Sequence, residues 1–185
     1  MSDIPLDPND LVQSFGYETV LTITGITKKF DAERQQDILV IEYKTENGDT
    51  YTDYITIISK GVPVTRKDSK WGLFLTIIAT TTVYKQIMEQ VQKQDKDRFG
   101  TFLDGLIGCK FRCIAFTNYP VNVPIIDAVK AVLNKDNSIF KNKRRTISRF
   151  IAPFEFISRN SVDTKTVTMQ ESVITDEISV REDGE

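Results

Sequence analysis

Residues 38–59 read ILVIEYKTENGDTYTDYITIIS. Two runs rich in β-branched and aromatic residues flank Asn47-Gly48, a pair that suits the two positive-φ positions of a type I′ turn. The stretch therefore predicts a β-hairpin. Upstream, residues 17–29 have the same composition with alternating faces, and a polar turn over 31–37 separates them from the hairpin. The whole segment 17–59 predicts a three-stranded antiparallel meander.

A helical period follows the meander. Apolar residues recur at i, i+3, i+4 and i+7, with Ser69 placed to cap the first helix and the Thr80–Thr82 run placed to interrupt it. The groups are Trp71, Phe74, Leu75 and Ile78; Tyr84, Ile87, Met88 and Val91; and Phe99, Phe102, Leu103 and Leu106. They predict two or three short amphipathic helices.

The strand pattern returns at Cys109–Phe116, whose one face carries both cysteines with Phe111 and Ala115. Pro124 suits the first turn of a helix that ends near Leu133. A last strand over 148–158 contains Pro153, which predicts an edge position or a bulge. The order β-β-β-α-β-(α)-β is that of a five-stranded OB barrel. We therefore expect a mainly β fold, an OB-like barrel with helices between strands 3 and 4 and between strands 4 and 5.

The chain divides into three predicted parts. Residues 1–16 form an N-terminal extension, and residues 17–158 form the barrel domain with a helical insert over about 69–107. Residues 159–185 form an acidic tail that we expect to be flexible.

Two short motifs carry a family resemblance. Ser69-Lys70-Trp71-Gly72-Leu73-Phe74-Leu75 and the later Leu106-Ile107-Gly108-Cys109-Lys110-Phe111 resemble a helix start and a fourth strand of small OB-fold-like proteins of phages and archaea. The likeness covers about residues 17–117, and Cys109 departs from the family pattern by standing between Gly108 and Lys110. Some members of that family are single-stranded DNA-binding replication proteins, so the resemblance implies a role in the replication or recombination of a viral or archaeal genome.

Composition excludes several classes of enzyme. The 185 residues include no histidine, so Ser-His-Asp catalysis, Cys-His catalysis and His-ligated zinc are excluded. Two cysteines cannot supply a four-cysteine zinc site, and we expect no cofactor. We expect the acidic, proline-broken N-terminus not to act as a signal peptide, and no apolar run reaches the roughly 20 residues needed to span a bilayer. We expect a cytoplasmic protein, in the host cytoplasm if viral, with no membrane partner.

Charge is segregated along the chain although 24 basic and 26 acidic residues nearly balance. Residues 59–70 hold four cations against one acid, and residues 135–149 hold six against one. Residues 161–185 hold seven acids against two cations. Basic loops suit phosphate contacts, and the loop before the fifth strand of an OB fold is one of those that grip oligonucleotides.

These observations predict non-enzymatic binding of single-stranded nucleic acid with low sequence specificity, with DNA as the expected ligand and RNA as the alternative. Aromatic side chains on strands can stack on bases, although the same residues can equally be core. The predicted phosphate contacts are Lys110, Arg112, Lys141, Lys143, Arg144, Arg145 and Arg149, and the predicted stacking residues are Tyr43, Tyr54 and Phe116.

Other interpretations stay open. The acidic tail is either a solubilising terminus or a segment that recruits replication proteins or competes for the basic surface. The barrel can instead be a protein-interaction or assembly module. Glu42-Tyr43-Lys44 matches the (D/E)-x-K step of magnesium-dependent nucleases, with Asp31 or Asp37 as the further acid. Cys109 and Cys113 are expected to be small buried hydrophobes.

Overall fold

The computed structural model describes residues 15–66, 68–117, 119–120, 123–136, 138–140, 146–147 and 150–159. The strands are β1 (Gly16–Asp31), β2 (Gln36–Lys44), β3 (Thr50–Ser59), β4 (Val62–Pro63), β5 (Cys109–Phe116), β6 (Tyr119–Pro120), β7 (Thr146–Ile147) and β8 (Phe150–Arg159). The helices are α2 (Lys70–Ala79), α3 (Thr82–Gln92), α4 (Arg98–Leu106) and α5 (Ile125–Leu133), with a 3₁₀ turn at Ser138–Phe140. Of the predicted tail, Arg159 belongs to β8, and residues 160–185 lie outside the described residues, as does the N-terminal extension up to residue 14.

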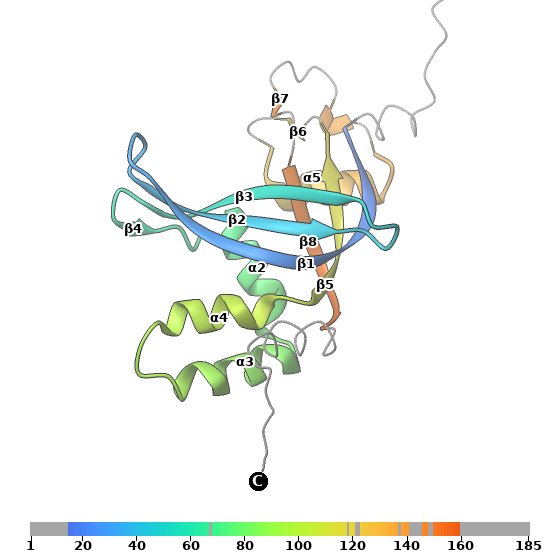
Figure 1. The fold of residues 1–185 in the computed structure, drawn as a ribbon. Coiled ribbons are helices and arrows are strands. Elements are labelled where there is room, and N and C mark those ends of the chain that lie inside the picture. Colours follow the sequence, from blue (N-terminus) through green and yellow to red (C-terminus); the bar gives the residue numbers. More distant parts are fainter. Residues whose placement is uncertain are drawn as a thin grey trace, which may run out of the picture.

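Six strands form one antiparallel sheet in the order β4-β3-β2-β1-β5-β8. β1 is 16 residues long and pairs with β5 through its first half and with β2 through its second. Because β5 returns after a long connection to lie beside β1, strands β5, β1, β2 and β3 form a Greek key. The sheet curls into a half-barrel, with α3 and α4 below it and α5 at its upper end (Figure 1).

The mainly β prediction is confirmed, and the barrel is more open than the sequence suggests. β3 and β8, the third and fifth strands of the predicted barrel, are not joined by any ladder among the described strands. Helix α2 instead packs against both of them. β8 pairs only with β5 among these strands, and its register shifts at Pro153, so the predicted edge position and bulge are confirmed.

The β2–β3 hairpin forms as predicted, but its turn is of another type. Gly48 has a φ of 96°, whereas Asn47 is not among the described residues with positive φ. The Gly48 N–H donates to the Thr45 carbonyl at 3.1 Å, and the Thr45 N–H donates to the Asp49 carbonyl at 2.8 Å. This is a three-residue loop with glycine in the left-handed position, so the type I′ prediction is wrong.

The predicted helix boundaries hold closely. Ser69 caps α2 by accepting from the Gly72 N–H at 3.0 Å, and Thr81 caps α3 in the same way within the interrupting threonine run. α5 begins one residue later than expected, because Pro124 occupies its N-cap.

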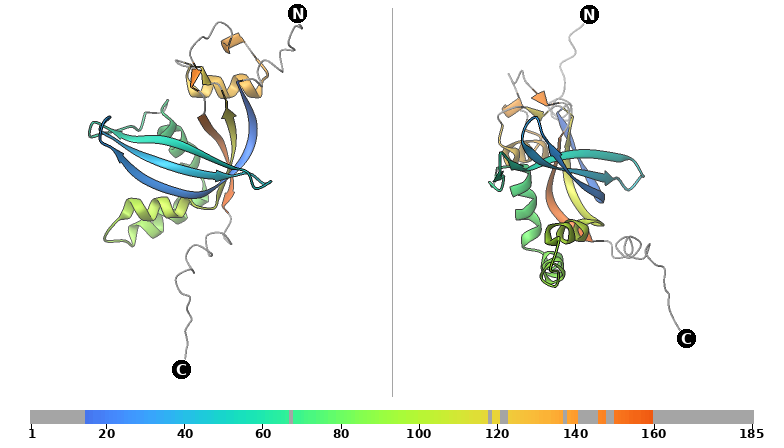
Figure 2. Two further views of the ribbon diagram at one scale, coloured as in Figure 1. Left: turned by 45° about the horizontal axis from the view of Figure 1, so that its top comes forward. Right: turned by 60° about the vertical axis from the view of Figure 1, so that its left-hand side comes forward.

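Two hydrophobic cores lie on opposite sides of the curled sheet. The larger one lies inside the curl, between the sheet and helices α2, α3 and α4, with Phe74 and Phe111 fully buried. The smaller one lies on the other face of β5 and β8, where α5 covers them (Figure 2). Cys109 and Cys113 are free and buried in the larger core, as predicted.

Candidate nucleic-acid interface

The outer face of β2 and β3 is open to solvent. Tyr54 projects from this face with 61% of its surface exposed, directly opposite Val40 on β2. Thr52 and Glu42 form the next exposed pair along the same face. None of the described helices packs against this face, because α2 to α4 lie inside the curl and α5 covers the upper end of β5 and β8. Tyr54 is therefore placed as a stacking residue must be.

Two lysines extend this face across the neighbouring strands. Thr22 on β1 is opposite Lys44 on β2 and also opposite Lys110 on β5. Residues directly opposite one another in antiparallel strands point to the same side of the sheet, so the two lysines flank Thr22 on the outer face. Lys44 has no carboxylate partner among the described residues. Lys44 is not among the phosphate contacts predicted from the sequence.

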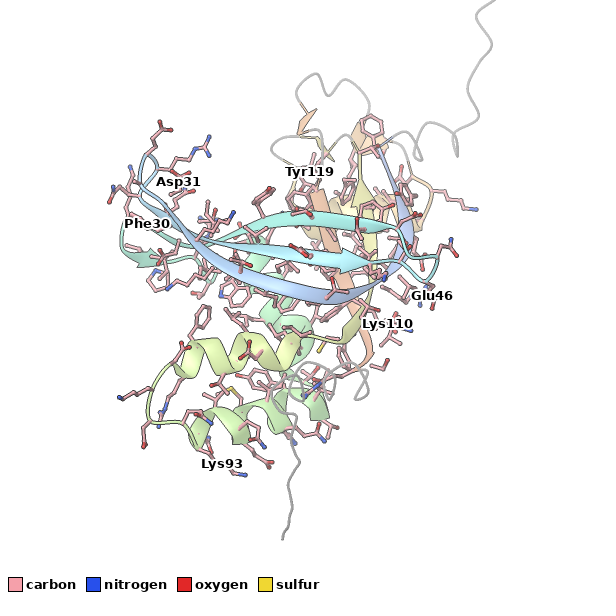
Figure 3. The ribbon with its side chains drawn as sticks, viewed as in Figure 1. Phe30, Asp31, Glu46, Lys93, Lys110 and Tyr119 are labelled. Carbon is pink, nitrogen blue, oxygen red and sulfur yellow. The ribbon has the colours of Figure 1, made fainter. Side chains whose placement is uncertain are left out.

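Lys110 forms a long ion pair with the exposed Glu46. Its Nζ lies 3.6 Å from Glu46 Oε2 in the β2–β3 loop, and Figure 3 shows the two side by side at this end of the sheet. Exposed pairs of this kind contribute about 0–1 kcal/mol, so a phosphate can displace Glu46 at little cost. Lys110 remains a suitable phosphate contact.

Arg112 is held by two carboxylates. Its guanidinium donates to Glu18 at 2.6 and 3.0 Å and to Glu155 at 3.0 Å, which links β1, β5 and β8. The pKa of Arg112 is raised, mainly by its hydrogen bonds to Glu18 and to a lesser extent by the negative charges of Glu18 and Glu155. One cation between two anions leaves net negative charge there, so this geometry favours a strand-linking role over a phosphate contact.

Two predicted stacking residues are inside the protein. Tyr43 is 0% exposed in the larger core, and Phe116 is 1% exposed in the smaller core. Tyr43 shares the inward face of β2 with Leu39 and Ile41, and Phe116 packs edge-on against the Tyr119 and Phe150 rings. A ring without accessible surface cannot stack on a base, so the expectation for these two residues is corrected.

The predicted basic contacts Lys141, Lys143, Arg144, Arg145 and Arg149 lie outside the described residues. They remain predictions from the sequence.

A buried ion pair at the open edge of the half-barrel was not anticipated. Asp53 points inward from β3, and its Oδ2 lies 2.7 Å from Lys70 Nζ at the start of α2. Lys70 also donates to the Tyr54 carbonyl at 2.9 Å and lies 4.1 Å from the centre of the Phe150 ring on β8. Burial raises the pKa of Asp53, an effect that Lys70 and the backbone N–H of Ile151 partly offset. Burial likewise lowers the pKa of Lys70, against the opposing attraction of Asp53.

Metal-dependent chemistry gains no support from the described residues. They contain no cluster of three acids, cysteines or histidines that could hold an ion. Glu42 and Lys44 do share the outer face, but Asp37 and Asp31 lie toward the other end of the β1–β2 hairpin. In the same part of the chain, no helix has both the length and the apolar character needed to cross a bilayer.

Comparisons with known proteins return no relative. The chain matches no family model, no curated protein sequence and no solved structure.

Proposed function

We propose that the protein binds single-stranded nucleic acid, with DNA as the expected ligand, across the outer face of β1, β2, β3 and β5. The observation that carries this proposal is the exposed Tyr54 on an uncovered sheet face that also presents Lys44 and Lys110. A stacking ring with nearby cations is the arrangement that sequence-tolerant single-strand binders use. No catalytic step is part of the proposal.

The topology supports the same surface. In an OB fold, the face of strands 2 and 3 binds oligonucleotides together with the loops between strands 1 and 2 and between strands 4 and 5. β2 and β3 are the corresponding strands here, and the basic segment 141–149 belongs to the connection between β5 and β8. We propose that this half-barrel is an OB variant whose basic connection adds phosphate contacts.

Charge reversal tests the proposal. Lys44→Glu and Lys110→Glu should each weaken binding of labelled oligo(dT), measured by fluorescence anisotropy on the full chain. The matched control is Lys93→Glu, the same charge change at the end of α3, away from the sheet (Figure 3). Equal affinities for the wild type and both outer-face variants would contradict the proposal.

A different feature favours the alternative, a protein-interaction module. A groove of about 350 Å³ lies between the β3–β4 hairpin and α4, lined by Lys28, Ile58, Pro63, Trp71 and Phe99 among others. Phe99 is 37% exposed there. If oligo(dT) does not bind, this groove is the first surface to probe by Phe99→Ala in an association assay.

A further inference from the structure

The half-barrel has a mouth at the end where β1 and β3 begin. Tyr17 on β1 and Tyr51 on β3 lean toward each other there, with their hydroxyl oxygens 2.6 Å apart. They line a partly open cleft of about 40 Å³, together with Thr52, Thr117 and the apolar rings of Phe116 and Phe150. Neither the sequence motifs nor the outer face accounts for this cleft.

The cleft is rigid at its base and accessible at its rim. The Phe150 ring stacks on Tyr119 at 4.5 Å and meets Phe116 edge-on at 6.0 Å, so neighbouring aromatic rings fix the Phe150 ring. Tyr17 keeps 38% of its surface exposed. A cleft of this size holds a few water molecules, so it admits the edge of a ring rather than a whole base. The exposed part of Tyr17 provides the surface on which such a ring can stack.

The cleft is continuous with the proposed interface. Thr52 lines the cleft and also stands on the outer face, two residues from Tyr54 and therefore about 7 Å away along β3. β3 is the edge of the sheet at this point, because β4 pairs only with Ile58 and Ser59. A nucleic-acid strand that crosses Tyr54 can therefore round the β3 edge at Thr52 and reach the mouth.

We propose that this mouth is a second base-binding subsite, in which a nucleobase of the bound single strand stacks on Tyr17 and turns its polar edge toward the hydroxyls of Tyr51 and Thr52. This inference rests on the proposed function and adds the path of the strand. Hydroxyl groups both donate and accept hydrogen bonds, so these side chains can pair with the edge of any base. A subsite of this chemistry favours no particular base.

Two measurements on the full chain test the subsite. Oligo(dT) carrying 5-iododeoxyuridine should cross-link, on long-wavelength irradiation, to the peptides that contain Tyr17 or Tyr51. Tyr17→Ala should weaken oligo(dT) binding by roughly 5- to 150-fold, the loss of one stacked base. Tyr17→Phe keeps the ring and should retain most of the affinity. Tyr84→Phe on α3 is the control for losing a tyrosine hydroxyl away from the mouth, and thermal melting verifies that each variant is folded.

The outcomes separate this inference from the proposed function. If the wild type binds oligo(dT) and Tyr54→Ala weakens it, but Tyr17→Ala binds like the wild type and neither peptide cross-links, the subsite is wrong and the outer-face interface stands. If the wild type does not bind at all, the proposed function fails and the subsite fails with it.

Discussion

Lys70 Nζ lies 2.7 Å from Asp53 Oδ2 at the point where the sheet leaves β3 and β8 unpaired. The lysine comes from α2, its ring contact Phe150 comes from β8, and the carboxylate comes from β3. The ion pair joins α2 to β3, and the contact of Lys70 with the Phe150 ring adds β8.

Removing one partner of this pair should destabilise the fold strongly. The side chain of Asp53 is 7% exposed and that of Lys70 is 19% exposed. Asp53→Asn or Lys70→Met therefore leaves the other residue as a buried charge without its partner, and each variant should lower the free energy of unfolding by about 3–5 kcal/mol. Urea denaturation measures the change.

The double variant tests whether the charges of Asp53 and Lys70 interact. Asp53→Asn with Lys70→Met removes both charges and should be far less destabilised than the sum of the single variants, because neither desolvation penalty remains. Additive losses would show that the two charges do not interact.

Tyr54→Ala should weaken oligo(dT) binding without changing stability. The ring is 61% exposed, so its loss removes little packing. It should remove about 1–3 kcal/mol of stacking. Phe30→Ala deletes a ring that is 62% exposed at the tip of the β1–β2 hairpin and serves as the matched control in the same titration. Equal losses of oligo(dT) affinity in the two variants would contradict a specific stacking role for Tyr54.

Gly72 should not tolerate a side chain. A Cβ at this position would lie 1.9 Å from the Arg66 carbonyl oxygen, so the loop before α2 would have to move. Gly72→Ala should lower the free energy of unfolding by about 1–3 kcal/mol, in contrast to Thr76→Ala at an exposed position of the same helix. An unchanged urea midpoint for Gly72→Ala would contradict the close approach.

Alkaline pH should destabilise the protein through its buried thiols. Burial raises the pKa of Cys109 from 9.0 to about 12 and raises that of Cys113 as well. A group whose pKa is higher in the folded than in the unfolded state stabilises the fold at pH values below its unfolded-state pKa. This stabilisation is lost as the pH rises toward the folded-state pKa. Stability should therefore fall between about pH 9 and pH 12, and less steeply in Cys109→Ala. A thiol reagent at neutral pH should label both cysteines only after unfolding.

The sequence predicted what depends on short-range patterns. The alternation of apolar and polar residues predicted both ends of β5 correctly. It also separated the strand face that carries Cys109 from the face that carries Lys110. It could not show that Phe116 would be buried against Phe150, because that contact joins β5 to β8, which are far apart in the chain. Tyr43 was ambiguous because both faces of β2 carry apolar residues. Asp53 did offer a signal, a carboxylate on the otherwise apolar face of β3, but nothing local identifies Lys70 as its partner.

Titration of the wild-type chain with oligo(dT) at two salt concentrations shows whether the protein binds single-stranded DNA through phosphate contacts. Each phosphate contact on a single strand contributes about 0.7 to the slope of log affinity against log salt. We expect measurable binding that weakens as salt rises, with a slope reduced by about 0.7 in Lys44→Ala. No binding at low salt, or affinity that is independent of salt, would contradict it.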